Sequence, residues 1–266
     1  MKYLTINTDD FGLNKDIDRG IIEAFNKGIL TDASLMANGP NYEQAIRFAK
    51  ELKIPIAAHI NLIRGKMLTG FQPTGSIIDF WKKSLEKKYL VGIEQEARAQ
   101  IEKILNDGVK INQINSEKHS HFFPPVFKLW VKLAEEYEIP YIRFIKEFNL
   151  IPSLQGIKAN LLSIFSITNI KYLNNSTVKS TNYFRGILIT GKINSTRLIK
   201  TIKTLKEGWT ELMVHIGYNG EIDKSMGQYF LTQSREEELK ALLNPNFKDI
   251  ISTLNIKLKS FGGLNG

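Results

Sequence analysis

Two adjacent acids, Asp9 and Asp10, directly follow the first apolar run of the chain. Burying a carboxylate without a partner is costly, so a pair of acids at this point favours chemistry over packing. At a strand end the backbone turns, and both side chains can then reach one cavity. One of them could bind a metal ion while the other acts as a base. The simpler alternative is that one aspartate only caps the helix that follows.

All four histidines of the chain lie at or just beyond the C-terminal ends of predicted strands: His59, His119, His121 and His215. In parallel α/β folds, active-site residues collect at that end. A neutral imidazole suits a divalent cation, so His59 is a candidate metal ligand. His215 is well suited to protonate a leaving group. A single histidine is more often a structural residue than a functional one. Four histidines at strand ends, with carboxylates nearby, indicate a functional site.

The segment 115–121 reads N-S-E-K-H-S-H. With the period-two alternation of a strand, its residues Asn115, Glu117, His119 and His121 would share one face. One carboxylate and two imidazoles on one face indicate metal binding or acid–base chemistry. Glu117 and His119 are therefore candidate metal ligands.

Together, these residue types could catalyse the hydrolysis of an amide or ester. A bound cation lowers the pKa of its water, and a nearby carboxylate takes the proton. The metal stabilises the oxyanion, and an imidazolium protonates the departing amine. These residues alone do not identify the substrate.

The elements that must position these residues alternate regularly between strand and helix. Strands are predicted over residues 3–8, 32–37, 54–62, 111–118, 140–144, 186–190, 211–217 and 256–261. Helices are predicted after the capping residue Asn14 and over residues 42–52, 91–105, 124–136, 195–206 and 234–243. This alternation predicts a parallel sheet, either a barrel or a doubly wound sheet, in a single domain over residues 1–266. Residues 63–90 and 148–185 are the least regular, and we expect them to be loops that cover the site.

The composition is that of a globular enzyme, with 42% hydrophobic and 24% charged residues among 266. Cysteine is absent, which excludes disulfides, thiolate metal sites and a cysteine nucleophile and suits the cytoplasm. Neither a signal peptide nor a membrane span is predicted. The net charge of +9 favours anionic partners, but its basic residues are dispersed and form no nucleic-acid motif, so no nucleic-acid partner is expected.

Several motifs together resemble the YdjC-like carbohydrate deacetylases. Residues 8–13, T-D-D-F-G-L, resemble the opening A-D-D-F-G-L of that family. Residues 28–36, G-I-L-T-D-A-S-L-M, resemble its G-I-V-T-S-A-S-L-M, and residues 59–62, H-I-N-L, are similar to its H-L-N-L. Residues 139–143 and 212–215 also have counterparts in the expected order. The resemblance extends from residue 3 to about residue 260.

The resemblance implies a single-domain (β/α) barrel, TIM-like or distorted and seven-stranded, related to NodB-type polysaccharide deacetylases. It also implies a divalent metal ion (Zn²⁺, Mg²⁺ or Mn²⁺), an N-acetylated sugar as substrate, and a homodimer. By position, Asp9 resembles the general base and His215 the general acid. Asp10 and His59 resemble metal ligands, and Arg143 resembles an arginine that orients the base or the substrate.

The chain departs from the family at its third ligand. The family pattern before the proline is D-S-H-x-H-x-H, and its first histidine binds the metal. Here Glu117 occupies that position and Asn115 replaces the acid. Glutamate is a suitable ligand for Zn²⁺, Mg²⁺ or Mn²⁺. His119 could complete the site instead after a shift along the strand, or metal binding could be lost. The leading hypothesis is a sugar deacetylase, and the alternative is a catalytically inactive carbohydrate-binding relative.

Overall fold

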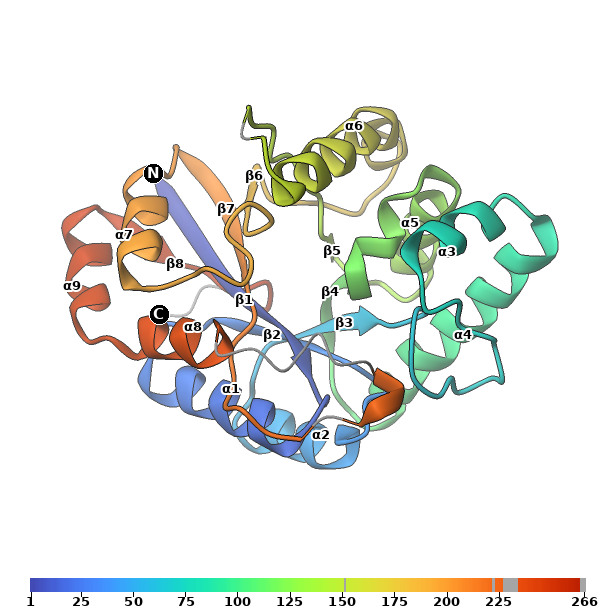
Figure 1. Ribbon diagram of the computed structural model, residues 1–266, viewed down its shortest axis with the longest axis horizontal. Helices are drawn as coiled ribbons and strands as arrows, with labels where there is room; N and C mark the ends of the chain where they lie inside the picture. The colour runs from blue at the N-terminus through green and yellow to red at the C-terminus, as the bar shows by residue number, and fades with distance from the viewer. Residues whose placement is uncertain (151, 222, 227–233, 264–266) are drawn as a thin grey trace.

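Eight parallel strands form one curled sheet in the computed structural model, which describes residues 1–150, 152–221, 223–226 and 234–263 (Figure 1). The strands are β1 (Lys2–Phe11), β2 (Asp32–Leu35), β3 (Ile56–Ile60), β4 (Ile111–Ser116), β5 (Tyr141–Ile142), β6 (Tyr183–Arg185), β7 (Gly208–Val214) and β8 (Ile256–Leu258). Their order is β5-β4-β3-β2-β1-β7-β6, and β8 pairs with the first residues of β1. Because every pairing is parallel, the C-terminal strand ends lie together at one end of the sheet.

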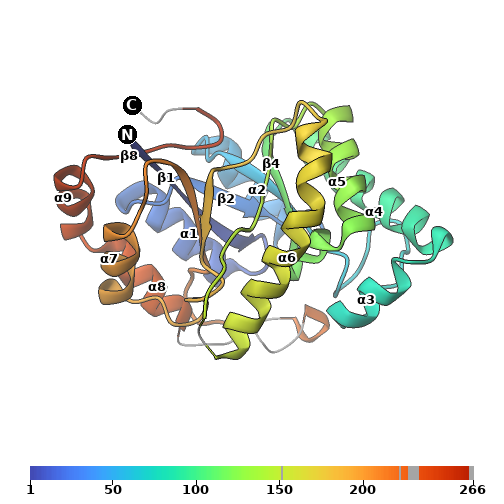
Figure 2. The same cartoon turned by 90° about the horizontal axis from the view of Figure 1, so that it is seen from above.

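Nine α-helices of the described residues surround this sheet (Figures 1 and 2). They are α1 (Lys15–Lys27), α2 (Tyr42–Glu51), α3 (Ile77–Lys83), α4 (Lys87–Asn106), α5 (Pro124–Glu136), α6 (Leu154–Asn174), α7 (Ser195–Lys203), α8 (Ser234–Leu243) and α9 (Asn246–Thr253). Two 3₁₀ segments, η1 (Glu117–Phe122) and η2 (Lys224–Met226), complete the elements. The expected fold is confirmed in its distorted form: a curled half-barrel of parallel strands alternating with helices.

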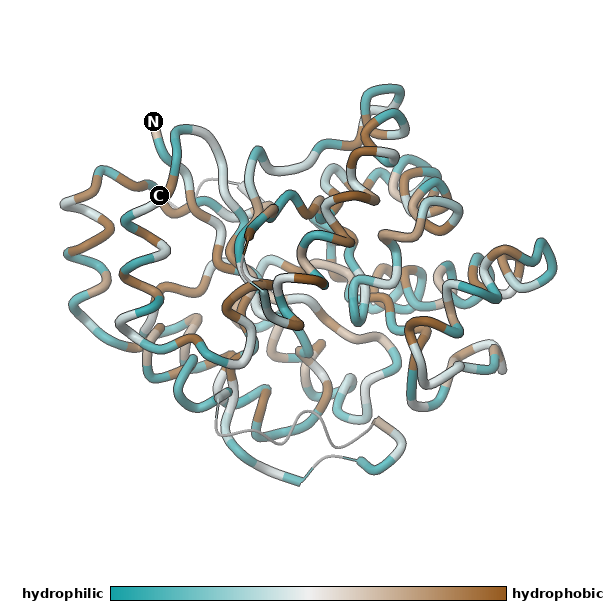
Figure 3. The backbone as a smooth tube through the Cα atoms, turned by 45° about the horizontal axis from the view of Figure 1, so that its top comes forward, coloured by the Kyte–Doolittle hydropathy of each residue, from teal (hydrophilic) through white to brown (hydrophobic). Residues whose placement is uncertain are grey.

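Local sequence signals explain the first helix. The Asn14 side chain accepts a hydrogen bond of 2.7 Å from the backbone N–H of Ile17, as an N-cap residue should. Ile17, Ile21 and Ala24 are spaced along one face, and all three are buried against the sheet. Figure 3 shows the same alternation of apolar and polar residues along other helices around the sheet.

Two predictions about elements are wrong. Residues 186–190 form a turn, and the strand lies just before them, at β6. The irregular stretches 63–90 and 148–185 are not only loops, because they contain α3 and the 21-residue helix α6. Apolar residues occur all round α6, which obscures its helical periodicity in the sequence. Leu154, Ile157 and Ile164 remain exposed on it.

The sheet is open between its edge strands β5 and β6, and two contacts span the opening. Lys179 forms a parallel bridge with Tyr141 of β5. The buried carboxylate of Glu147 accepts hydrogen bonds from the backbone N–H groups of Gly186, Ile187 and Leu188, directly after β6. Strands β5 and β6 are therefore linked by these contacts, although they do not pair with each other to close a complete barrel.

None of the described helices is both long enough and apolar enough to cross a membrane.

The C-terminal segment is attached to the sheet by a buried acid, Asp32 at the start of β2. Its Oδ1 accepts hydrogen bonds from the Ser260 hydroxyl and the Phe261 backbone N–H. Burial raises the pKa of Asp32 to about 7, although these hydrogen bonds and one with Thr31 lower it. The folded state therefore holds this proton more tightly than the unfolded chain does. The stability of the fold should decrease as the pH rises from about 4 to about 7.

We expect Asp32→Asn, which keeps the acceptor oxygen, to be more stable than the wild-type protein at pH 8, by ~1–3 kcal/mol. At pH 4 the gain should largely disappear, because the wild-type carboxyl is then protonated in the folded state. Urea unfolding of both proteins at the two pH values measures the difference. An equal change in the free energy of unfolding at both would contradict the prediction.

Candidate functional site

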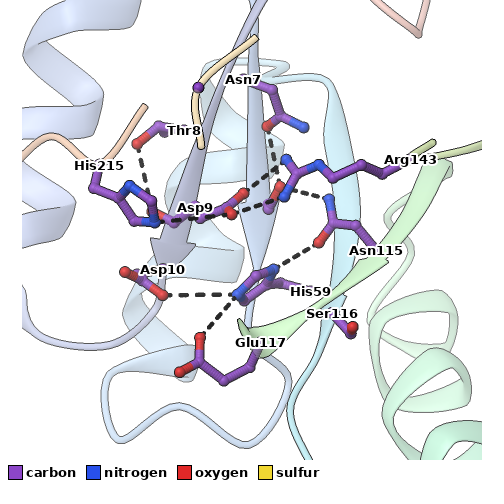
Figure 4. Close-up of polar contacts among 12 residues, drawn as sticks. Asn7, Thr8, Asp9, Asp10, His59, Asn115, Ser116, Glu117, Arg143 and His215 are labelled. Atoms are coloured by element: carbon purple, nitrogen blue, oxygen red, sulfur yellow. Dashed lines mark hydrogen bonds and ion pairs between the residues drawn. The ribbon is translucent and has the colours of Figure 1, made fainter. Parts of the chain in front are cut away.

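A bulge in β1 directs two adjacent aspartates into one site. The register with β2 shifts between Thr8 and Phe11, and Asp10 has a φ of 72°, which is rare for a residue other than glycine. Asp9 and Asp10 therefore lie in one site, as expected, although of the two only Asp9 lines the pocket (Figure 4). The sequence predicts that the backbone turns because the strand ends at these aspartates. Instead, β1 continues to Phe11, and a bulge within the strand redirects the two side chains.

Asp10, His59 and Glu117 form a buried cluster of potential metal ligands at the C-terminal strand ends. The Nε2 atom of His59 lies 3.7 Å from Asp10 Oδ1 and 3.5 Å from Glu117 Oε2. Donor atoms bound at about 2.1 Å to one tetrahedral ion would be separated by about 3.4 Å. Asp10 Oδ1 and His59 Nε2 are also buried without a hydrogen-bond partner among the described residues. The three side chains thus fit a divalent cation.

Asn115 orients His59 toward this cluster. Its Oδ1 lies 2.6 Å from Nδ1 of His59, and its Nδ2 donates to Ser34 and Gln113. The amide oxygen can only accept, so Nδ1 carries a proton, and Nε2 is the nitrogen left to offer its lone pair to a bound cation. Asn115 therefore performs the orienting role that a carboxylate often has beside a metal-binding histidine.

The segment that carries Glu117 is not an extension of β4. The strand ends at Ser116, and Glu117–Phe122 forms the 3₁₀ segment η1. Lys118 and His119 have φ values of 52° and 56°, so the backbone reverses there. The prediction that alternate residues from 115 to 121 share one strand face is therefore wrong. Glu117 reaches the cluster through this turn.

Each carboxylate of the cluster has an arginine on its second oxygen. Arg64, in the loop after β3, contacts Glu117 Oε1 at 2.9 Å, and Arg235 on α8 contacts Asp10 Oδ2. The oxygens Asp10 Oδ1 and Glu117 Oε2 remain directed toward His59. These arginines balance the negative charge of the buried ligands.

The charges of the cluster determine the protonation of its members. Burial lowers the pKa of His59, but Asp9, Glu117 and Asp10 together raise it to about 9. Burial raises the pKa of Glu117, but His59 and Arg64 hold it below its usual range. Without a cation, the imidazolium of His59 therefore supplies positive charge between the carboxylates.

Asp9 is held by a buried guanidinium rather than by the cluster. Arg143, which follows β5, contacts both its carboxylate oxygens at 2.7 and 2.9 Å (Figure 4). Arg143 Nε also contacts Glu211 of β7 at 2.8 Å. Burial raises the pKa of Asp9, but Arg143, with His59 and His215, holds it far below its usual range. Asp9 is thus a fixed anion at neutral pH.

His215 follows β7 on the other side of Asp9. Its Nε2 lies 4.0 Å from Asp9 Oδ2, and its imidazole is partly exposed to the pocket (Figure 4). Two glycines determine how closely α1 approaches this segment. A Cβ atom on Gly20 would lie 2.7 Å from Gly217 Cα, and one on Gly217 would lie 2.8 Å from Ile17 Cα. Neither position has space for a side chain.

The remaining two histidines lie outside the cluster. His119 is buried at the pocket wall beside Phe184, and burial lowers its pKa well below the usual value. His121 packs among aromatic rings, with Nδ1 2.6 Å from Ser116 Oγ and Nε2 3.2 Å from the Arg143 carbonyl oxygen. Of the candidates on this segment, Glu117 is the one that the structure brings to Asp10 and His59.

The site opens into a pocket of about 650 Å³. Asp9, Glu117 and His215 line it together with the cationic side chains Lys118 and Lys158. Carboxylate, imidazole and ammonium groups therefore line the same pocket. This arrangement can hold a substrate with its reacting bond beside Asp9 and His215.

Sequence reasoning missed the partners of the site residues. Glu211 left a signal, because it is a charged residue within an apolar strand, and such a residue must have a buried partner. Arg64 and Arg235 left none, since nothing in the pattern of their own segments links them to carboxylates elsewhere in the chain.

Comparison with known proteins places the chain among named relatives. A sequence profile of YdjC-like proteins matches residues 3–253. A carbohydrate deacetylase of Clostridium beijerinckii is 31% identical over 264 residues, covering 97% of this chain and 98% of the relative. A carbohydrate deacetylase of Thermoanaerobacter pseudethanolicus is 28% identical over 270 residues, covering 98% of both.

A solved structure supports the fold. It is an Enterococcus faecalis protein described as a candidate cellobiose-phosphate cleavage protein, with a TM-score of 0.74, 21% identity, and 98% of both chains covered. The profile match extends over most of the chain, and the curated relatives align over nearly all of it. This chain therefore belongs to the YdjC-like family.

Proposed function

We propose that this protein is a metal-dependent hydrolase that removes an acetyl group from an N-acetylated sugar. The observation that carries the proposal is the cluster of Asp10, His59 and Glu117 beside Asp9 and His215. Asp10 Oδ1 and His59 Nε2 are buried in it without a hydrogen-bond partner among the described residues. The names of its full-length relatives, carbohydrate deacetylases, support the reaction and the class of substrate.

Asp10, His59 and Glu117 are the proposed metal ligands. Two carboxylate oxygens and one imidazole nitrogen suit Zn²⁺, Mg²⁺ or Mn²⁺, and the second carboxylate favours the harder ions. Such an ion, when bound, would make a water molecule more acidic and would stabilise negative charge on the carbonyl oxygen. His119 is the alternative third ligand expected from the sequence, and we keep it as the alternative to Glu117.

The other residues of the site have roles in proton transfer. Asp9 is the proposed general base, because it is anionic, fixed by two contacts from Arg143, and close to the cluster. Arg143 is the residue that orients this base. His215 is the proposed general acid for the departing amine, because its Nε2 lies 4.0 Å from Asp9 Oδ2 and its side chain lines the pocket.

Two expectations about the protein outside its active site remain predictions. The homodimer implied by the family resemblance is one, and a cytoplasmic location is the other.

Acetate release from N-acetylglucosamine oligosaccharides tests the proposed function directly. We expect turnover that a chelator abolishes and that added Zn²⁺, Mg²⁺ or Mn²⁺ restores, because activation of water depends on the cation. Turnover that is unchanged after complete metal removal would contradict the metal-dependent mechanism. If acetate appears only in the variant Glu117→His, the natural chain is the inactive carbohydrate-binding relative.

A matched pair of variants identifies the third ligand. We expect Glu117→Gln to weaken divalent-ion binding roughly 10- to 100-fold, because an amide oxygen carries no negative charge. His119→Gln should bind the ion as the wild-type protein does. Isothermal titration calorimetry with Zn²⁺ and Mn²⁺ measures both. The reverse pattern would assign His119 as the ligand.

Asp9→Asn separates the base from the metal site. We expect kcat to fall by about 10²- to 10⁴-fold, the usual contribution of a general base, while divalent-ion binding is retained. Asp249→Asn, at an exposed position on α9, is the control. Steady-state kinetics and calorimetry on the same preparations measure the two effects. A variant with near-normal kcat would remove Asp9 from this role.

A further inference from the structure

One buried acid beside the site, Glu238 on α8, has no role in the reaction described above. Its Oε2 accepts a hydrogen bond of 2.7 Å from the backbone N–H of His215. Its other oxygen, Oε1, is buried and has no hydrogen-bond partner among the described residues. Buried polar atoms are rarely left in this state, so the oxygen needs an explanation.

The side chain of His215 also has a buried atom that lacks a partner among the residues that the structure describes and could pair with Glu238 Oε1. The imidazole Nδ1 is also buried without a hydrogen-bond partner in the described part of the chain. The two unpartnered atoms belong to residues that are already joined through the His215 backbone and that line the same pocket. A carboxyl group can carry a proton and Nδ1 can carry a lone pair, so the two atoms are complementary.

We propose that Glu238 is a positioning residue for the general acid: its Oε1–H donates to Nδ1 of His215 and keeps the histidine's own proton on Nε2. The hydrogen bond from the His215 backbone N–H to Oε2 already holds this carboxyl group beside the histidine. The inference rests on the proposed function, because it gives His215 the role of general acid.

The electrostatics of the pair agree with this geometry. Burial raises the pKa of Glu238 to about 8, although the His215 N–H, the charge of Arg235 and the Gly191 N–H lower it. Burial lowers the pKa of His215, although Asp10 and Asp9 raise it. At neutral pH the carboxyl group is therefore protonated and the imidazole neutral. Their pKa values have moved in opposite directions, as in other acid–base pairs.

The proton on Glu238 solves a chemical problem for a neutral histidine. A neutral imidazole that gave up its only N–H proton would become an imidazolate, which is far too basic to form here. As the carbon–nitrogen bond breaks, its electron pair goes to the amine nitrogen, which takes the Nε2 proton. Nδ1 takes the proton of Glu238 in the same step. Glu238 is left as a carboxylate. A solvent proton from the pocket then returns to Nε2, and Nδ1 gives its proton back to Glu238, which restores the starting state.

Leaving-group dependence tests this proposal. Glu238→Gln keeps an acceptor for the His215 N–H but cannot pass a proton to Nδ1. We expect kcat for acetate release from an N-acetylglucosamine oligosaccharide to fall roughly 10- to 100-fold, with KM within about 2-fold. With 4-nitrophenyl acetate, whose leaving group needs no proton, the loss should be under about 3-fold.

Glu237→Gln is the matched control, because Glu237 is an exposed neighbour on the same helix and pairs only with Lys240 among the salt bridges of the described residues. It should leave both activities unchanged. Equal losses on the amide and the aryl ester in Glu238→Gln would overturn the proposal, because a structural disturbance would affect both alike.

A second measurement needs no substrate. In ¹⁵N-histidine NMR spectra, only four histidines contribute, and His215→Gln identifies the signals of His215. We expect a protonated Nε2 and an accepting Nδ1 at neutral pH. The Nδ1–H tautomer would overturn the proposal. If the wild-type protein releases no acetate at all, the proposed function fails, while these spectra still decide how the pair is protonated.

Discussion

The buried guanidinium of Arg143 is the contact on which the rest of the site depends. It lies between Asp9 on β1 and Glu211 on β7 and binds both carboxylates at hydrogen-bond distance. Without it, two buried negative charges would face each other, at a cost of about 3–5 kcal/mol for one broken buried pair. The same contact joins Asp9 to the sheet. The packing inside the half-barrel and the negative charge of Asp9 therefore both depend on Arg143.

The interior polar residues extend this constraint to the ligand cluster. Asn7 and Gln113 contact Glu211, and Gln113 also accepts from Asn115, which orients His59. Each ligand carboxylate, in turn, has an arginine on the oxygen that faces away from His59. The site is therefore a continuous hydrogen-bonded network. Its geometry is determined inside the barrel, before any substrate binds, which is the condition for preorganised catalysis.

Much of this architecture could be predicted from local patterns. The strands that carry or precede Asp9, His59 and His215 follow from apolar runs, and motif order indicated the family. The path of Glu117 could not be predicted, because Lys118 and His119 adopt left-handed conformations that are uncommon for any residue other than glycine. Tertiary contacts impose that turn, including the hydrogen bond from His121 N–H to Ser116 Oγ. The helix α6 was missed because an all-round apolar surface has no periodicity to detect.

The close approach of Gly20 and Gly217 has a consequence for how this protein can change over time. The backbone of α1 lies directly against the backbone of Gly217 there, with no room for a Cβ atom on either glycine. At most surface helices, a new methyl group would merely loosen packing. At either glycine it would instead push α1 away from the segment that carries His215, so we expect these two positions to resist substitution as strongly as the residues of the site do.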